Sequence, residues 1–344
     1  MNAPQTSQAA APAFHAGEQA LQARLGVRER MAEIGALVLR DHMPDQHREL
    51  FEKLPTLLLG ALDPASGRPW ATLLAGLPGF VHTPDARHMQ IAAEPASDDP
   101  VLARLQPGAA VGVLGLEPHT RRRNRMNGRL LAHEADGSLS LAVQQSFGNC
   151  PKYIQARRPL PLAPQARQRA PAQALGPGLD AAARALIARS DSLFIASAAA
   201  PQAQAGAQAW QGVDVSHRGG EPGFVRMQEE DVGEEGGGLT LLLPDYPGNQ
   251  FFNTLGNLAL HPWAGLLFVD YEQGGLLHLS ASAELLWPGD PGADLSPWPG
   301  AQRLLCLRVA AGLWRAGALP WRWSAPEPAP QFAALRAAGE TAGV

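Results

Sequence analysis

Short apolar segments bounded by turn residues recur along the whole chain. Most have the length of a strand and are rich in Leu, Val, Phe and Ile, which favours β-structure. In the first half we expect strands within 56–63, 69–76, 79–82, 88–93, 109–117, 119–134 and 138–147. In the second half we expect them within 191–198, 213–218, 224–225, 264–270, 275–287 and 302–323. The polar segment 119–134 alternates apolar positions with Arg123 and Arg125, which predicts a strand with one face in water.

Helical periodicity is confined to a few segments. Apolar residues spaced every third or fourth position predict a helix over 17–42 and another over 43–54, with Asp45 as the cap of the second. Short helices are expected at 98–105, 180–190 and 249–261, and a helical turn entered by Pro151 at 148–161. Residues 1–16 have little to bury and are expected to be disordered, and 325–344 are expected to form a loose tail.

The two halves of the chain repeat one order of segments. LPGFV at 77–81 matches EPGFV at 221–225, LLLGA at 57–61 matches LFIAS at 193–197, and VGVLGLE at 111–117 matches AGLLFVD at 264–270. The spacing grows only where the second half has longer turns, as expected of a duplicated β-domain. Chance similarity between alanine-rich strands is the alternative, and the shared PGFV argues against it. Each half then has six or seven antiparallel strands, whose short, regular spacing favours a barrel.

Composition narrows the classes of function. A chain of 344 residues with 45% hydrophobic and 17% charged residues can form two domains. Its net charge of −4 argues against a general nucleic-acid surface, and the short run RRRNR at 121–125 reads as a solvated strand face. Cys150 and Cys306 are too few for a disulfide framework. No signal peptide or apolar run of membrane-spanning length is found. We therefore expect a cytoplasmic protein that binds neither nucleic acid nor membrane.

One polar stretch stands out among these apolar segments. Ser216, His217 and Arg218 lie on an expected strand, and Asn253 and Thr254 open the helix expected nearby. Free N–H groups and the dipole of a helix start attract anions, and a guanidinium pairs with phosphate through two hydrogen bonds. The stretch therefore indicates a phosphate site. The plainer alternative is that these small polar residues only cap the helix.

The pattern resembles the pyridoxamine phosphate oxidase-like superfamily of split barrels that bind flavin mononucleotide (FMN). The resemblance covers nearly all of 45–320 and rests on four segments, DVSHRGGEPGFV at 214–225, GNQFFNTLGNLALHPWAGLLFVD at 248–270, HTRRRNRMNGRLL at 119–131 and QSFGNCPKYIQARRP at 145–159. It is closest to the uncharacterised branch that has two barrels in one chain. It implies a mainly β fold with peripheral helices, built as tandem FMN-binding split β-barrels from an internal duplication.

The resemblance also implies where the cofactor binds. In this superfamily two barrels pair with the flavin between them, and one barrel supplies the phosphate cradle. By motif position the cradle falls on Ser216, Arg218, Asn253, Thr254 and Asn257, and the adjacent His217 is included although alternation along the strand points it away. The strand beneath the ring falls on Arg123, Arg125 and Asn127. The family pattern has Ser, Arg and Lys at the helix start, whereas this chain has Thr254, Leu255, Gly256 and Asn257 and so lacks two positive charges.

The first half lacks phosphate-binding residues at the positions that match the cradle. Leu74 stands where the second half has Arg218, and its helix start carries Glu94, Asp98 and Asp99. Three carboxylates would repel a phosphate. We therefore expect one working cradle, in the second half, covered by the first half. The sequence leaves open whether the two barrels pair within one chain or between the chains of a homodimer.

These inferences together predict an FMN-dependent oxidoreductase acting on a small-molecule substrate. The electron donor is open, a separate flavin reductase being one choice, and no acid or base residue can be named. No metal site is expected, because the histidines lack ligand spacing. Cys150, beside Lys152, is either a reactive thiol or a small buried residue. The alternatives are a non-catalytic flavin- or heme-binding module and a structural protein with a vestigial site.

The same inferences divide the chain into five parts. We expect a disordered 1–16, a helical arm plus first barrel over 17–160, a linker over 161–178, a second barrel over 179–324 and the tail.

Overall fold

The computed structural model describes residues 12–163, 166–200, 212–230 and 238–335. Its labelled helices are α1 (Ala16–Arg24), α2 (Arg28–Val38), α3 (Asp45–Lys53), η1 (Leu102–Arg104), α4 (Ala181–Arg189) and α5 (Asn253–Leu260), and residues 330–335 are also helical. The strands of the first half are β1 (Thr56–Leu62), β2 (Pro69–Ala75), β3 (Val81–Asp85), β4 (His88–Ile91), β5 (Ala110–Glu117), β6 (Arg122–His133) and β7 (Leu139–Gly148). Two short strands follow, β8 (Pro159–Pro161) and β9 (Gln173–Leu175). The remaining strands are β10 (Ser192–Ala198), β11 (Val213–Gly219), β12 (Arg226–Glu230), β13 (Gly238–Asp245), β14 (Trp263–Val269), β15 (Leu276–Leu286), β16 (Arg303–Arg315) and β17 (Trp321–Trp323).

The fold is mainly β, and its two large sheets have one strand order. The first sheet runs β2-β1-β5-β6-β7-β4-β3, and the second runs β11-β10-β14-β15-β16-β13-β12, with β9 added beside β16. Every large-sheet pairing is antiparallel. Each strand of the first sheet therefore has a counterpart at the same place in the second sheet. The prediction of a mainly β fold with two antiparallel halves is confirmed to this extent.

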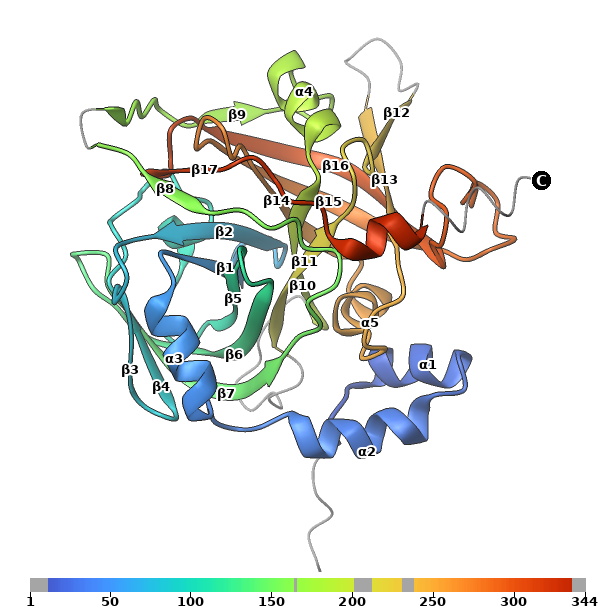
Figure 1. The fold of residues 1–344 in the computed structure, drawn as a ribbon, viewed down its shortest axis with the longest axis horizontal. Helices are drawn as coiled ribbons and strands as arrows, with labels where there is room; N and C mark the ends of the chain where they lie inside the picture. Colours follow the sequence, from blue (N-terminus) through green and yellow to red (C-terminus); the bar gives the residue numbers. More distant parts are fainter. Residues whose placement is uncertain (1–11, 164–165, 201–211, 231–237, 336–344) are drawn as a thin grey trace, which may run out of the picture.

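The two sheets pack against each other within one chain (Figure 1). Their contact is formed mainly by β1, β2 and β5 on one side and β10, β11, β14 and β15 on the other. Two glycines let the backbones approach. A Cβ on Gly112 would lie 2.5 Å from the carbonyl oxygen of Val213, and a Cβ on Gly265 would lie 2.5 Å from that of Pro69. Gly112 and Gly265 hold matching positions in the two halves, so the contact is the same from both sides.

Each sheet covers its own apolar core, and a third cluster joins them. In the first half α3 adds Leu50, Phe51 and Leu54 to the core, and in the second half α4 and α5 do so with Leu186 and Leu255 among others. The shared cluster contains residues from β1, β2 and β5 together with residues from β10, β11 and β14. Burial of these side chains supplies the main drive for the two halves to stay together.

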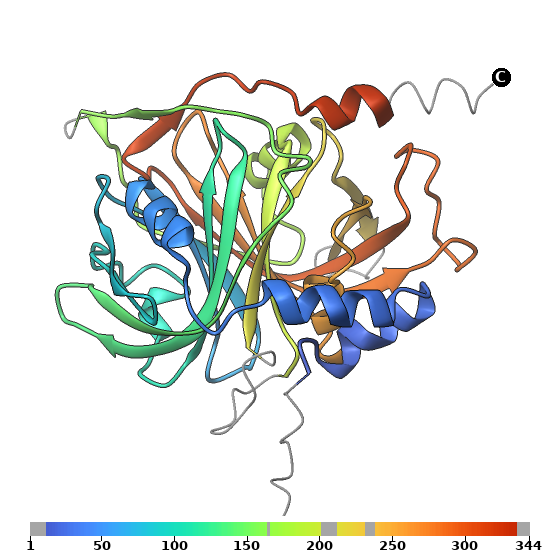
Figure 2. The same cartoon turned by 60° about the horizontal axis from the view of Figure 1, so that its bottom comes forward.

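The N-terminal region departs from the expected single helix. Gly26 adopts a left-handed φ of 66° and separates α1 from α2, so that the chain turns back on itself. The expectation of disorder up to residue 16 is also wrong for its last residues, because Phe14 and His15 are buried. Phe14 packs edge-on against Phe251 at 5.2 Å between ring centroids. Residues 1–11 lie outside the described residues. Figure 2 shows this arm of two helices crossing beneath the sheets.

Three further expectations need correction. The segment 148–161 contains a turn and no helix, because Tyr153, two residues after Pro151, has a left-handed φ of 65°. The expected linker over 161–178 contributes β9, which pairs with β16, and it begins at the last residue of β8, which pairs with β17. The tail is not loose as far as it is described, since Phe332 is buried and Ala156 pairs with Glu327. Among the described residues, no helix is long and apolar enough to cross a bilayer.

Candidate functional site

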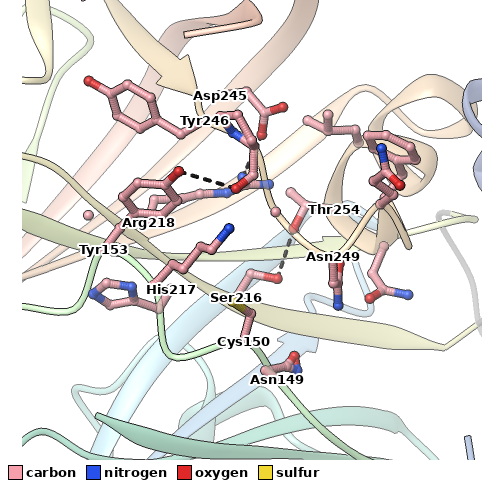
Figure 3. A pocket seen from close by; sticks show the side chains of 18 of the residues that line it. Asn149, Cys150, Tyr153, Ser216, His217, Arg218, Asp245, Tyr246, Asn249 and Thr254 are labelled. Carbon is pink, nitrogen blue, oxygen red and sulfur yellow. Dashed lines mark hydrogen bonds and ion pairs between the residues drawn. The ribbon is translucent and has the colours of Figure 1, made fainter. Parts of the chain in front are cut away.

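A polar pocket of about 160 Å³ lies where the two halves meet (Figure 3). The first half supplies Arg123 and Arg125 from β6 and the turn from Asn149 to Tyr153. The second half supplies β11, the end of β13 and the start of α5. Of the residues predicted for the site, Ser216, His217, Arg218, Asn253, Thr254, Arg123 and Arg125 line this pocket. The structure therefore brings together residues from two halves that are far apart in sequence.

The start of α5 opens into the pocket without a cap. Phe252, the residue before the helix, has a left-handed φ of 62°, and within the described chain no side chain accepts its first N–H groups. Phe252, Asn253, Thr254 and Leu255 all line the pocket. The first N–H groups of a helix have no partner inside the helix and carry a partial positive charge. This helix start can therefore receive an anion, and Asn253 and Thr254 do not serve as its caps.

Ser216 and Arg218 reach the pocket because side chains alternate along β11. The Ser216 hydroxyl oxygen accepts hydrogen bonds from Arg125 and from Thr254 Oγ1, the latter at 2.9 Å. Both lone pairs of the oxygen are then used, which leaves its own hydrogen for another acceptor. His217 lies between them and packs against Phe194 at 5.5 Å between rings. Burial lowers the pKa of His217 well below its usual value, so the ring stays neutral.

Arg218 shares one carboxylate with a second arginine. Its Nη1 lies 2.7 Å from Asp245 Oδ1, and Arg303 Nε lies 3.4 Å from Asp245 Oδ2. The two guanidinium groups and one carboxylate carry a net positive charge. The buried Nε of Arg218 has no hydrogen-bond partner in the part of the chain that is described. Arg218 is therefore tethered at one end and retains a donor, as an anion-binding arginine requires.

Arg125 is the centre of a buried network between the halves. Its Nη1 donates to Asp214 Oδ1 at 3.0 Å and to Asn253 Oδ1 at 2.9 Å. Only 4% of Arg125 is exposed, so the expected wet face of this strand is wrong. The reason is tertiary, since β11 of the other sheet covers that face. Asp214 was missed in the sequence, because Arg125 and the other groups that it contacts lie far along the chain.

Asn127 and Asn257 lie beneath the pocket. Asn127 donates to Asp214 at 2.8 Å, and Asn257 donates to the other oxygen of Asp214 at 2.9 Å. Both asparagines are buried and neither lines the pocket. Their place in the structure is to hold Asp214, and through it Arg125. Of the predicted site residues, these two are the ones that do not reach the pocket.

Arg123 adds another positive charge to the pocket. Its Nε donates to the Cys150 carbonyl oxygen at 2.7 Å, and no ion pair with a carboxylate is present within the described ranges. Burial, followed by repulsion from Arg125 and Arg218, lowers the pKa of Arg123 to about 10. Lys152 also lines the pocket, as does the free thiol-bearing Cys150. The site is therefore positive although the whole chain is acidic.

A pair of tyrosines forms an aromatic wall that the sequence did not indicate. Tyr153 and Tyr246 stack at 5.2 Å with an angle of 27° between their planes. The Tyr153 hydroxyl donates to the Pro247 carbonyl oxygen at 3.2 Å. Tyr153 comes from the first half and Tyr246 from the second, so no spacing rule could have paired them. Flat aromatic surfaces next to cationic groups suit a planar ligand that carries negative charge.

A smaller pocket lies at the matching place of the first half, and its own carboxylate fills the anion position. Asp99 Oδ1 accepts from the N–H groups of Val101 and Leu102 at 2.9 and 3.0 Å. Asp99 Oδ2 accepts from the Thr72 hydroxyl and from Arg315 Nη1, the latter at 2.7 Å. Thr72 is the counterpart of Ser216 on β2.

The expectation of repulsion by unpaired carboxylates therefore needs correction. Asp98 also pairs with Arg315, at 2.9 Å, and Glu94 pairs with Arg167 at 3.1 Å. Each of the three acidic side chains therefore pairs with an arginine, and Asp98 and Asp99 share Arg315. The N–H groups of the turn, the Thr72 hydroxyl and Arg315 Nη1 already donate to Asp99 here, whereas within the described chain no side chain caps the start of α5.

Comparisons with known proteins give little beyond this geometry. No family model and no curated protein matches the sequence. One similar solved chain is a candidate pyridoxamine 5'-phosphate oxidase from Lactobacillus delbrueckii, with 17% identity over 31% of this chain and 95% of the other, and a TM-score of 0.25. Another is MrkH, a c-di-GMP-dependent transcription regulatory factor, with 9% identity over 76% of this chain and 78% of the other, and a TM-score of 0.16. Likeness this low carries no argument about fold or function.

Proposed function

We propose that the chain is a flavoprotein that binds FMN at the pocket between its two halves, on tandem split barrels derived by duplication. The observation that supports this most is the anion cradle: an uncapped start of α5 beside Ser216 and Arg218, facing arginines of the other half. Arg218 Nε, Arg125 Nε and Asn149 Nδ2 are buried donors without partners in the described chain. Donors left in this state fit a ligand with several anionic oxygens.

The residues divide by their expected contacts. Ser216, Arg218 and the N–H groups that open α5 hold the phosphate, with Asn253 and Thr254 fixing the helix start. Arg123 and Arg125 face the ring system from the other half. Bound flavin supplies hydride or electron transfer to a small-molecule substrate. Positive charge near its ring favours the reduced, anionic form, and the donor of electrons can be a separate reductase.

The heme alternative has less support from the pocket. Axial ligation needs His or Met, and among the described lining residues the one candidate is His217. Its ring packs against Phe194 on the far face of β11. Heme also lacks the phosphate that would use the start of α5. We therefore place FMN ahead of heme.

The experiment is a titration of the purified protein with FMN and with riboflavin, followed by flavin absorbance and fluorescence. If Arg218 holds the phosphate, Arg218→Ala should weaken FMN binding by roughly 1.5–3 kcal/mol, about 10- to 150-fold. Riboflavin binding should hardly change, because riboflavin lacks the phosphate. Asp245 keeps Arg303 as an ion-pair partner in the variant, so its buried carboxylate is not left without a counter-charge.

Arg122→Ala is the matched control, since Arg122 is exposed at the start of β6 and does not line the pocket. It should bind FMN as the unchanged chain does. Equal affinity for FMN and riboflavin in the unchanged chain would show that no phosphate is held here. A titration with hemin that gives a tight Soret complex while FMN fails would favour the heme alternative.

A further inference from the structure

The N-terminal arm meets the candidate site at a crossing of two glycines. Helix α1 lies directly beside α5 in both views of the fold (Figures 1 and 2). A Cβ on Gly17 would lie 2.2 Å from the carbonyl oxygen of Gly256, and a Cβ on Gly256 would lie 2.6 Å from the backbone nitrogen of Glu18. The two backbones therefore touch. Gly256 is one of the positions where the chain departs from the family pattern, and the crossing explains why no larger side chain is present there.

Two side chains of the arm then reach the polar face of α5. His15 accepts from the N–H of Gly17 at its Nδ1, so its Nε2 carries the hydrogen that is donated to Asn257 Oδ1 at 2.9 Å. Glu18 accepts from the His15 backbone N–H at 2.9 Å through one oxygen and from Asn253 Nδ2 through the other. Both residues are buried. The arm thus contacts the two asparagines of α5 that the sequence assigned to the site.

These contacts connect Glu18 to the pocket by an unbroken series of hydrogen bonds. Asn253 donates its amide to Glu18 and accepts from Arg125 at its Oδ1. Arg125 in turn donates to Ser216, which lines the pocket. The orientation of the Asn253 amide is fixed by Glu18 on one side and by Arg125 on the other. Without the Glu18 acceptor, nothing at that end prevents the amide from turning and releasing Arg125.

The charged groups around Glu18 are few and can be named. His15 faces it from the turn before α1, Asp214 from β11, and Arg125 from β6. Helix α5 contributes the neutral amide of Asn253. Burial, followed by the negative charge of Asp214, raises the pKa of Glu18 to about 8. At neutral pH Glu18 is therefore mostly uncharged, and it gains its negative charge in mildly alkaline solution.

We propose that the arm is part of the anion-binding site and that Glu18 is its positioning residue, which holds Asn253 and Arg125 in place and sets the charge of the pocket through its own proton. The proposal rests on the proposed function in one respect, that the pocket takes an anion such as a phosphate. An uncharged Glu18 leaves Arg125 and its neighbours free to attract the ligand. An ionised Glu18 offsets part of that positive charge.

The direction in which anion affinity changes with pH follows from this arrangement. Anion affinity should be highest where Glu18 is protonated and should fall as the pH rises through about 8. One added negative charge near the arginines should lower affinity roughly 3- to 10-fold between pH 7 and pH 9. A phosphate monoester is already a dianion over most of this range, since its second pKa is near 6, so the change reports the protein.

The test compares the unchanged chain with Glu18→Gln, using FMN and inorganic sulfate as probes from pH 7 to pH 9. Glutamine cannot ionise, and its single amide oxygen keeps the acceptor for Asn253, while the hydrogen bond from the His15 backbone N–H to the second oxygen is lost. At pH 7 the variant should bind both probes as tightly as the unchanged chain does. At pH 9 it should bind them roughly 3- to 10-fold more tightly than the unchanged chain does, because its own affinity should hardly depend on pH. Glu33→Gln, on the exposed face of α2, is the matched control and should retain the full pH dependence. Carbon-13 NMR of glutamate-labelled protein should show a carboxyl titrating near pH 8 that is missing from Glu18→Gln.

Each outcome decides something. Equal pH dependence in the unchanged chain and in Glu18→Gln would overturn the proposal while leaving FMN binding intact. If the protein binds sulfate with a pH dependence that requires Glu18 but does not bind FMN, the proposal is supported and the proposed function is overturned. If neither probe binds at any pH, both fail. If Glu18→Gln does not fold, the NMR titration of the unchanged chain decides, and the absence of a carboxyl titrating near pH 8 would overturn the proposal.

Discussion

Asp214 carries the negative charge that lets Arg125 stay buried between the halves. It accepts from Arg125, Asn127 and Asn257, and 5% of the residue is exposed. Asp214→Asn keeps the shape but leaves a buried guanidinium without its counter-charge. We expect the free energy of unfolding to fall by about 3–5 kcal/mol, measured by urea denaturation. The exposed pair of Glu284 with Arg308 is the contrast, and Glu284→Gln should cost about 0.5 kcal/mol or less. Similar losses in the two variants would show that Asp214 is not the essential counter-charge.

The site residues that could be predicted from the sequence are those that lie within a recognisable local pattern of strand or helix residues. Ser216 and Arg218 alternate on one strand, and Thr254 opens a helix, so local pattern was enough to place them. Glu18, Asp214 and Tyr246 gave no signal because their partners are far along the chain. Arg125 was predicted to lie on a solvent-exposed face. Alternation along a strand shows which residues share a face, but whether that face is buried depends on the sheet that covers it.

At the scale of elements, the crossing of α1 and α5 depends on Gly256. Helix propensity alone would make Gly256→Ala more stable by about 1 kcal/mol. The new Cβ would instead meet the backbone of Glu18, and the arm would have to move. We expect a net loss of about 1–3 kcal/mol and faster limited proteolysis within α1 and α2. Gly176→Ala is the control, since a Cβ there meets nothing within 4 Å. A stabilised, protease-resistant Gly256→Ala would rule out the close crossing.

Element boundaries show the same division between local and distant causes. Strands such as β1, β5 and β14 fall where the apolar runs predicted them, because the run itself is what the core buries. The break between α1 and α2 was missed, because a single glycine within a helical pattern of apolar residues does not by itself indicate a left-handed turn. The turn at Tyr153 was read as helical for a related reason. Its backbone is held by packing against Tyr246 and Phe332, which lie far along the chain.

At the scale of the molecule, the internal repeat was visible in the sequence, but the pairing of the halves was not. Matched segments such as 111–117 and 264–270 predicted two similar sheets, and the strand orders agree. No pattern could say whether the sheets would pair within one chain. The structure shows that they do, through Gly112 and Gly265 at matching positions. A complete pocket therefore exists in a single chain, with β6 from one half and β11 and α5 from the other.

This pairing predicts one flavin per chain, whatever the oligomeric state. At the matching place of the first half, Asp99 already accepts from the helical turn, Thr72 and Arg315, so a second phosphate would have to displace its carboxylate. Calorimetric titration and native mass spectrometry should give a ratio of one FMN to one chain. The ratio should persist on dilution, because every residue of the pocket belongs to the same chain. A ratio of two per chain would mean that Asp99 can be displaced. A ratio of one per two chains, lost on dilution, would mean that the site is shared between chains and not enclosed within one.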